Sequence, residues 1–134
     1  MNASGIKRQG PLVLVVDDLP DVRAICSEYL VFRGFRVAAA EDGLAGLAQA
    51  FELHPDVILM DLSMPGLGGL EATGRLKRDR RTRDIPVIAM TAHAMPEERA
   101  EARAAGCDAV LTKPVSLKDL ERSVRRSLRE RQDH

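Results

Sequence analysis

Four consecutive apolar residues, 57–60, are followed at once by Asp61 and then by the turn-forming sequence Met64-Pro65-Gly66. An apolar run without polar alternation is typical of a strand that is buried on both faces, as in the middle of a parallel sheet. Ligands of open α/β sheets bind at the carboxyl ends of the strands, where such a strand meets the following loop. Asp61 is therefore the first candidate functional residue.

The rest of the chain repeats this strand pattern and alternates it with helical spacing. Further strands are predicted over 12–16, 35–40, 87–90 and 109–112, and helices over 20–33, after Asp42, over about 70–78, over 96–105 and from 117 onward. Five such β-α pairs predict one five-stranded parallel sheet with five helices, joined by right-handed crossovers and covering both faces. The predicted architecture is a doubly wound, flavodoxin-like (βα)5 fold.

The spacing of apolar residues also predicts which side of each helix is buried. The first helix is expected to bury Val22, Ile25, Cys26, Tyr29 and Phe32 or Arg33, and the second to bury Leu44, Leu47, Ala48 and Phe51. Asp42 is a predicted helix cap. Ser116 and Asp119 form a capping pattern before a final helix with Leu117, Leu120, Val124 and Leu128 on one stripe.

The length of 134 residues fits one domain, predicted over 11–130, with a flexible arm over 1–10 and a short tail over 131–134. Twenty basic and twenty acidic residues cancel, so the charge indicates neither nucleic acid nor an anionic membrane as partner. No apolar run is long enough to cross a bilayer, and the N-terminus lacks the apolar core of a signal peptide. Cys26 and Cys107 fit packing residues of a reduced, cytoplasmic protein.

Polar residues follow four of the predicted strands directly, and parallel strands bring these ends to one edge of the sheet. They are Asp17, Asp18, Asp61, Thr91 and Lys113. Each has an ordinary explanation by itself, such as a helix cap, an Asx turn or a solvated loop lysine. All of them at matching strand ends indicate a site.

Three carboxylates in one place repel each other unless a cation joins them. Oxygen ligands suit Mg²⁺, and Mg²⁺ with Lys113 would balance the charge of the three aspartates. A carboxylate can accept a phosphoryl group, a reaction that depends on positioning and charge stabilisation. We therefore predict Asp61 as acceptor, Asp18 with Asp61 as metal ligands, Thr91 as a hydrogen-bond partner of the phosphoryl group, and Lys113 as its counter-charge.

The combination of Asp17-Asp18, Asp61 with Met64-Pro65-Gly66, Gly69-Leu70-Glu71, Thr91-Ala92 and Lys113-Pro114 resembles the receiver domain of two-component response regulators. The resemblance runs from about 12 to 128. It is greatest to the stand-alone receivers of chemotaxis or cell polarity, which have no output domain.

The resemblance implies a phosphorylation-dependent signalling switch rather than an enzyme, with only Mg²⁺-dependent self-phosphorylation and slow self-dephosphorylation. A histidine kinase or a histidine phosphotransfer protein would donate to Asp61, and a downstream protein would read the phosphorylated state. Mg²⁺ would be held by Asp18, Asp61 and the main-chain carbonyl of Ser63, with Asp17 assisting. The Lys113–Pro114 bond would be cis. The protein would be a cytoplasmic monomer or weak dimer.

Two further positions bear on how the switch works. Ser63 and His93 occupy positions that tune the lifetime of phosphorylation in this family, although His93 is equally an ordinary exposed loop residue. Receivers commonly carry Tyr or Phe three residues before the lysine, and here that position is Val110. Without a ring to rotate, backbone shifts between 91 and 106 would have to transmit the signal, or the switch is weak.

Several other interpretations stay open. A haloacid-dehalogenase-type phosphatase requires a second Asp two residues after the first, but here Ser63 is the residue two positions after Asp61. A nucleotide-binding fold would require a complete glycine motif, which this chain lacks. The chain could also be a docking receiver with an idle site, or a receiver excised from a hybrid kinase. Finally, Arg122, Arg125, Arg126 and Arg129 could form a basic face for an acidic partner or a simple solvated helix face.

Overall fold

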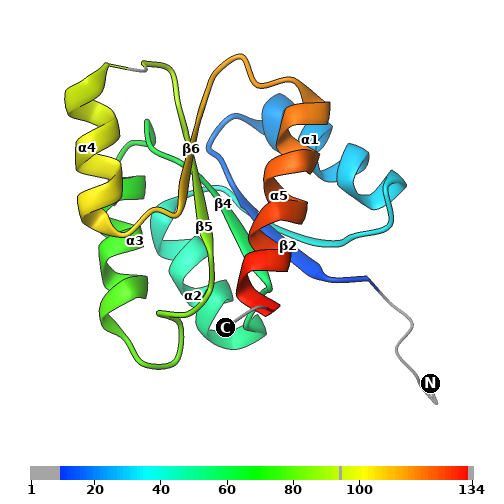
Figure 1. Ribbon diagram of the computed structural model, residues 1–134, viewed down its shortest axis with the longest axis horizontal. Helices are drawn as coiled ribbons and strands as arrows, with labels where there is room; N and C mark the ends of the chain where they lie inside the picture. The colour runs from blue at the N-terminus through cyan, green and yellow to red at the C-terminus, as the bar shows by residue number, and fades with distance from the viewer. Residues whose placement is uncertain (1–9, 94, 133–134) are drawn as a thin grey trace.

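The computed structural model describes residues 10–93 and 95–132 and contains one parallel five-stranded sheet (Figure 1). The strands lie in the order β3-β2-β4-β5-β6, so that β4 with Asp61 is central. Their bounds are Leu12–Val16 for β2, Arg36–Ala40 for β3, Val57–Asp61 for β4, Val87–Thr91 for β5 and Ala109–Thr112 for β6. The predicted doubly wound (βα)5 architecture is confirmed.

Five helices cover the sheet from both sides. They are α1 (Pro20–Phe32), α2 (Gly43–Leu53), α3 (Gly69–Arg78), α4 (Pro96–Ala105) and α5 (Leu117–Gln132). Successive strand residues point to opposite faces, so Val13 and Val15 pack in the α1–α5 layer, whereas Leu14 and Val16 pack in the layer under α2, α3 and α4. Because both faces are covered, the strands are apolar without alternation.

The predicted buried faces of α1 and α2 are partly wrong. Ile25 and Phe32 are 54% and 82% exposed, because α1 packs through Cys26 and Leu30. Each residue turns a helix by about 100°, which carries Phe32 nearly to the opposite side from Leu30. In α2, Leu44 is 64% exposed and Ala48 is also exposed, since the helix meets Val16 through Gly46. This close approach rotates the buried face onto Gly43, Gly46, Leu47 and Ala50.

The ends of the helices follow the predicted caps. Asp42 accepts a hydrogen bond from the Ala45 amide at 2.8 Å, and the Ser116 hydroxyl accepts one from the Asp119 amide at 3.0 Å. The predicted arm over 1–10 lies outside the described residues apart from Gly10, and so do 133–134 of the predicted tail. Within 10–93 and 95–132, no helix has the length and apolar character needed to cross a membrane.

A polar clamp joins α1 to α5 on the surface of the α1–α5 layer. The Glu121 carboxylate accepts hydrogen bonds from the Tyr29 hydroxyl at 2.8 Å, from Arg33 Nε at 3.0 Å and from Arg125 Nε at 2.9 Å. Arg125 also stacks over the Phe35 ring at 4.8 Å. These bonds, led by the one from Tyr29, lower the pKa of Glu121 from 4.5 to about 2.

The lowered pKa makes the clamp dependent on pH. Because the folded state holds the ionised carboxylate, the clamp stabilises fully above about pH 4.5 and loses its effect as pH falls toward 2. We expect Glu121→Gln to melt below wild type at pH 7, with the two melting temperatures converging as pH falls through that window. Thermal unfolding followed by circular dichroism measures this. The control, Glu28→Gln, removes an exposed carboxylate from α1, and the same convergence there would contradict a specific clamp.

Candidate functional site

The predicted site residues lie together at one end of the sheet. Asp17 and Asp18 follow β2, Asp61 ends β4, Thr91 ends β5, and Lys113 follows β6. The register pairs Val16 with Met60 and Asp61 with Met90, which brings the three strand ends to the same level. The parallel topology therefore assembles the cluster that the sequence predicted.

Three carboxylates form the centre of this cluster. Asp17, Asp18 and Asp61 each offer an oxygen, and these three atoms lie within 4.8 Å of one another. Asp17 and Asp61 are 0% and 1% exposed. Each of these two has one oxygen fixed by a main-chain amide at 2.9 Å, from Leu19 and Ser63 respectively. The loop conformations thus hold the buried carboxylates in place.

Lys113 is the cation of the cluster. Its Nζ lies 3.4 Å from Asp17 Oδ2 and 3.4 Å from Asp61 Oδ2. One ammonium against three carboxylates leaves two negative charges, which one divalent cation would balance. An all-oxygen donor set of this kind fits Mg²⁺, a hard ion that keeps some of its waters. Ser63, whose main-chain carbonyl is the further predicted ligand, is exposed in the loop directly after β4.

The loop after β4 is fitted closely to the acceptor strand. Gly66 adopts a φ of +73°, a left-handed conformation in which a side chain is strained. Gly69 begins α3 against the backbone of Asp61, and a Cβ atom there would lie 2.3 Å from the Asp61 carbonyl oxygen. Gly66 and Gly69, which are part of the sequence motif, therefore shape the loop and the start of α3 beside Asp61.

Thr91 is buried, and its hydroxyl is engaged with the next loop. The hydroxyl donates to the His93 carbonyl at 3.0 Å and lies 3.2 Å from the His93 amide, from which it accepts. The His93 side chain is exposed, with Nδ1 3.8 Å from a Glu98 carboxylate oxygen. The Lys113 amide donates to the Thr91 carbonyl at 2.8 Å, and the Lys113–Pro114 bond is cis, as expected.

The described part of the region between 91 and 106, where backbone shifts were expected to transmit a signal, buries few apolar side chains. In α4 the buried residue is Ala102, and Arg99 reaches Thr112 of β6 through a hydrogen bond of 3.2 Å. Val110 is partly buried and packs against the core beneath α4. A helix with so little buried apolar area is held by a small free energy.

Sequence reasoning missed the surroundings of the cluster. A groove of about 450 Å³ reaches Lys113; it is lined by Val22, Ile25, Cys26, Met90, Lys113, Pro114, Val115 and Leu117. Burial raises the pKa of the Cys26 thiol and Asp17 raises it further, whereas Lys113 lowers it. Arg23 Nη1 also donates to the Asp17 carbonyl at 2.7 Å. Spacing within one helix carries no sign of these contacts, because they depend on how α1 sits beside the strand ends.

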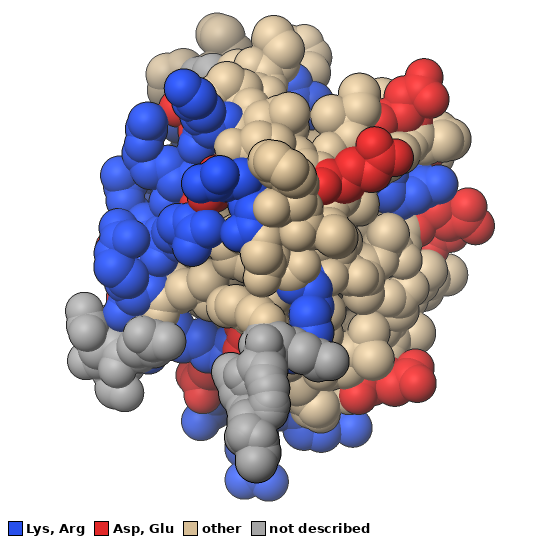
Figure 2. All heavy atoms as spheres, turned by 90° about the vertical axis from the view of Figure 1, so that its right-hand side faces the viewer, with Lys and Arg blue, Asp and Glu red and all other residues tan. Residues whose placement is uncertain are grey.

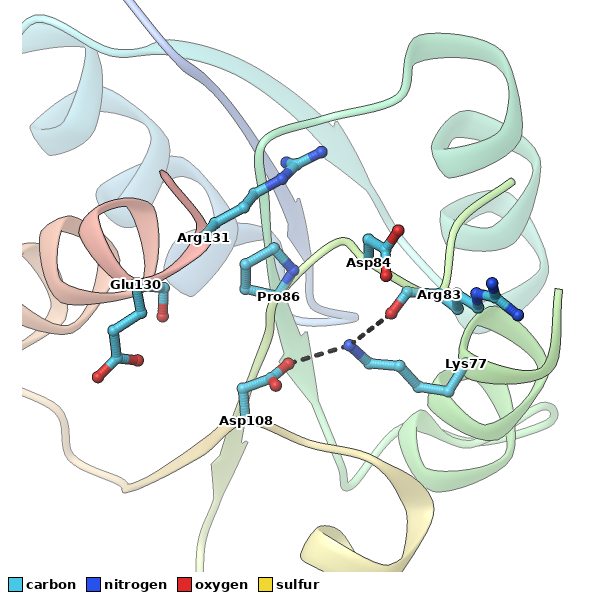
Figure 3. Close-up of a pocket in the computed structure, with 8 residues that line it drawn as sticks. Lys77, Arg83, Asp84, Pro86, Asp108, Glu130 and Arg131 are labelled. Atoms are coloured by element: carbon cyan, nitrogen blue, oxygen red, sulfur yellow. Dashed lines mark hydrogen bonds and ion pairs between the residues drawn. The ribbon is translucent and has the colours of Figure 1, made fainter. Parts of the chain in front are cut away.

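A second cavity, of about 550 Å³, lies between α3 and α5, beside the residues that precede β5 and β6 (Figure 3). Three of its charged lining residues, Lys77, Asp108 and Arg131, bond within the chain. Lys77 Nζ donates to the Ile85 carbonyl at 2.8 Å and lies 3.0 Å from Asp108 Oδ2, which also accepts from the Val87 amide at 2.8 Å. Arg131 donates to the Asp56 carbonyl at 3.0 Å. These residues join α3 and α5 to the sheet.

Comparison with known proteins gives one consistent family. Residues 13–125 match the response regulator receiver domain. The polar-differentiation response regulator DivK of Brucella ovis is 39% identical over 105 residues, which are 78% of this chain and 85% of that protein. The DNA-binding regulator RpaA of Synechocystis sp. is 38% identical over 119 residues, which are 89% of this chain and 49% of that protein. The chain thus spans about half the length of RpaA.

A solved structure extends the likeness to the fold. The receiver domain of the sensor histidine kinase PA1611 from Pseudomonas aeruginosa has a TM-score of 0.82 and 32% identity, with 89% of this chain and 98% of that chain covered. That structure contains a magnesium ion coordinated in the active-site cleft.

Proposed function

The chain belongs to the response regulator receiver domain family, and we propose that Asp61 accepts a phosphoryl group from a phosphohistidine in a reaction that requires Mg²⁺. The observation that carries the proposal is the cluster of three carboxylate oxygens within 4.8 Å, with Lys113 Nζ 3.4 Å from both buried aspartates. A buried carboxylate in such a cluster needs a cation to accept a further negative group.

Each residue of the cluster has a proposed role in the transfer. The bond between phosphorus and the donor nitrogen breaks, a bond from phosphorus to an Asp61 carboxylate oxygen forms, and the donor imidazole leaves. Asp18, Asp61 and the Ser63 carbonyl would hold Mg²⁺, with Asp17 supporting, and the ion would neutralise phosphoryl oxygens. Lys113 would share that charge, and Thr91 would exchange its bonds to His93 for one to a phosphoryl oxygen.

As a member of this family, the chain takes part in two-component signalling as a switch. We propose a histidine kinase or histidine phosphotransfer protein as donor and a protein as downstream partner, with no nucleic acid bound directly. Activity beyond self-phosphorylation and slow self-dephosphorylation is not expected. The cytoplasmic location, the monomeric or weakly dimeric state and the domain boundaries at 11–130 stay predictions. The phosphatase alternative is weaker, because Ser63 stands where its second aspartate belongs.

Acetyl phosphate replaces the unknown donor in the direct test. We expect the intact mass of the protein to increase by one phosphoryl group with acetyl phosphate and Mg²⁺, and to stay unchanged when EDTA removes the metal. An equal increase in EDTA would contradict the metal-dependent mechanism. If acetyl phosphate and purified histidine kinases all leave the mass unchanged, the idle docking receiver is the better description.

A further inference from the structure

A basic groove lies between the C-terminal part of α1 and the first half of α5, apart from the acidic cluster. It has a volume of about 420 Å³ and is lined by Tyr29, Arg33, Lys118, Glu121, Arg122 and Arg125. Four of these residues are basic and one is acidic, although the whole chain carries no net charge. Figure 2 looks onto the side of the molecule with α1 and α5, where Lys and Arg side chains gather on the left.

The clamp described above organises the arginines of this groove. Arg33 and Arg125 both bond the Glu121 carboxylate through Nε, and their side chains remain 47% and 45% exposed. Arg33 is held through Nε, and Arg125 also donates from Nη2 to the Arg33 carbonyl at 3.3 Å. Ordering a guanidinium in this way reduces the entropy lost when its remaining N–H groups bind a ligand. Arg126 and Arg129 continue the positive charge along α5, as does Arg122, whose Nη1 bonds the Asp119 carboxylate at 2.9 Å; all three arginines are exposed. The groove is thus a partly ordered set of donors for carboxylates.

An exposed apolar edge borders the groove. Phe32, at the end of α1, is 82% exposed. Phe32 lies three residues after Tyr29, a spacing that places the two side chains near each other on the helix surface. Aromatic residues beside arginines are the combination that protein interfaces favour.

We propose that this α1–α5 groove docks an acidic segment of a partner protein. Acidic side chains of the segment pair with Arg33, Lys118, Arg122 and Arg125, and an apolar side chain packs on Phe32. Charge complementarity selects an acidic occupant, and the apolar edge favours a protein segment over a polyphosphate backbone. The proposal does not depend on phosphorylation of Asp61, because neither Asp61 nor its neighbours line the groove.

The probe is a fluorescein-labelled peptide rich in glutamate that carries one leucine, together with its glutamine counterpart. Fluorescence anisotropy with the 134-residue chain measures their affinities. The test variant is Lys118→Gln with Arg122→Gln, which removes two groove charges and leaves the bonds of Glu121 intact. The matched control is Arg78→Gln with Arg103→Gln, which removes two exposed charges from α3 and α4.

The acidic peptide should bind wild type and the control equally, and bind the groove variant about 3- to 10-fold more weakly. Affinity should fall as salt rises. Phe32→Ser should also weaken binding while leaving the melting temperature within about 2 °C, because an exposed side chain contributes little to stability. The proposal is overturned by equal losses in both double variants, by equal binding of the glutamine peptide or by no binding of the acidic peptide. Tighter binding to duplex DNA or to anionic vesicles also overturns it.

Discussion

Asp61→Asn is expected to abolish the gain of a phosphoryl group from acetyl phosphate, and the loss should be complete. An amide has no anionic oxygen to form the bond with phosphorus, whereas it keeps nearly the same size in a position that is 1% exposed. Lys113, the proposed counter-charge, and Asp18, a proposed metal ligand, are left in place. Intact-mass spectrometry in the presence of Mg²⁺ gives the result directly.

Two further variants identify the cause of that loss. Asp18→Asn keeps the acceptor and removes one proposed metal ligand, so phosphorylation should be slower and should recover partly at higher Mg²⁺ concentration. Asp84→Asn, at an exposed position just before β5 and so at the opposite edge of the sheet from the site, should behave as wild type. A phosphoryl group found on the Asp61→Asn protein would place the acceptor on another residue.

The positions of the site residues were predictable because they depend on few features of the sequence. Apolar runs mark strands that are buried on both faces, and parallel connections bring the ends of all strands to one edge of the sheet. Asp17, Asp61 and Lys113 therefore had to converge once the strands were recognised. Their convergence required no knowledge of side-chain packing.

The faces of the helices were less predictable, because packing against the sheet decides them. Leu44 fits an apolar stripe as well as Leu47 does, yet α2 turns Gly46 to Val16 and leaves Leu44 in solvent. The contacts within the α1–α5 groove were hard to predict for the same reason. Glu121 lies 92 residues after Tyr29 and 88 after Arg33 in the sequence, so no local pattern reveals the clamp.

The second large effect is expected at Gly69, the first residue of α3. A methyl group there would lie 2.3 Å from the Asp61 carbonyl oxygen and 2.9 Å from the Leu62 Cα atom. Backbone atoms cannot move aside as a flexible side chain can, so α3 or the end of β4 must shift. We expect Gly69→Ala to lower the free energy of unfolding by about 1–3 kcal/mol, as overpacking commonly does. It should also slow phosphorylation by acetyl phosphate, because the shift displaces Asp61.

Gly74→Ala in the same helix is the matched control. There the nearest atom to the added methyl group is Arg78 Nη1 at 3.0 Å, at the far end of a flexible side chain. Relief from glycine within a helix should raise the stability by about 0.5–1 kcal/mol. Urea unfolding and phosphorylation rates of both variants make the comparison. If Gly69→Ala were as stable and as readily phosphorylated as Gly74→Ala, close packing of α3 on the Asp61 backbone would not be what positions the acceptor.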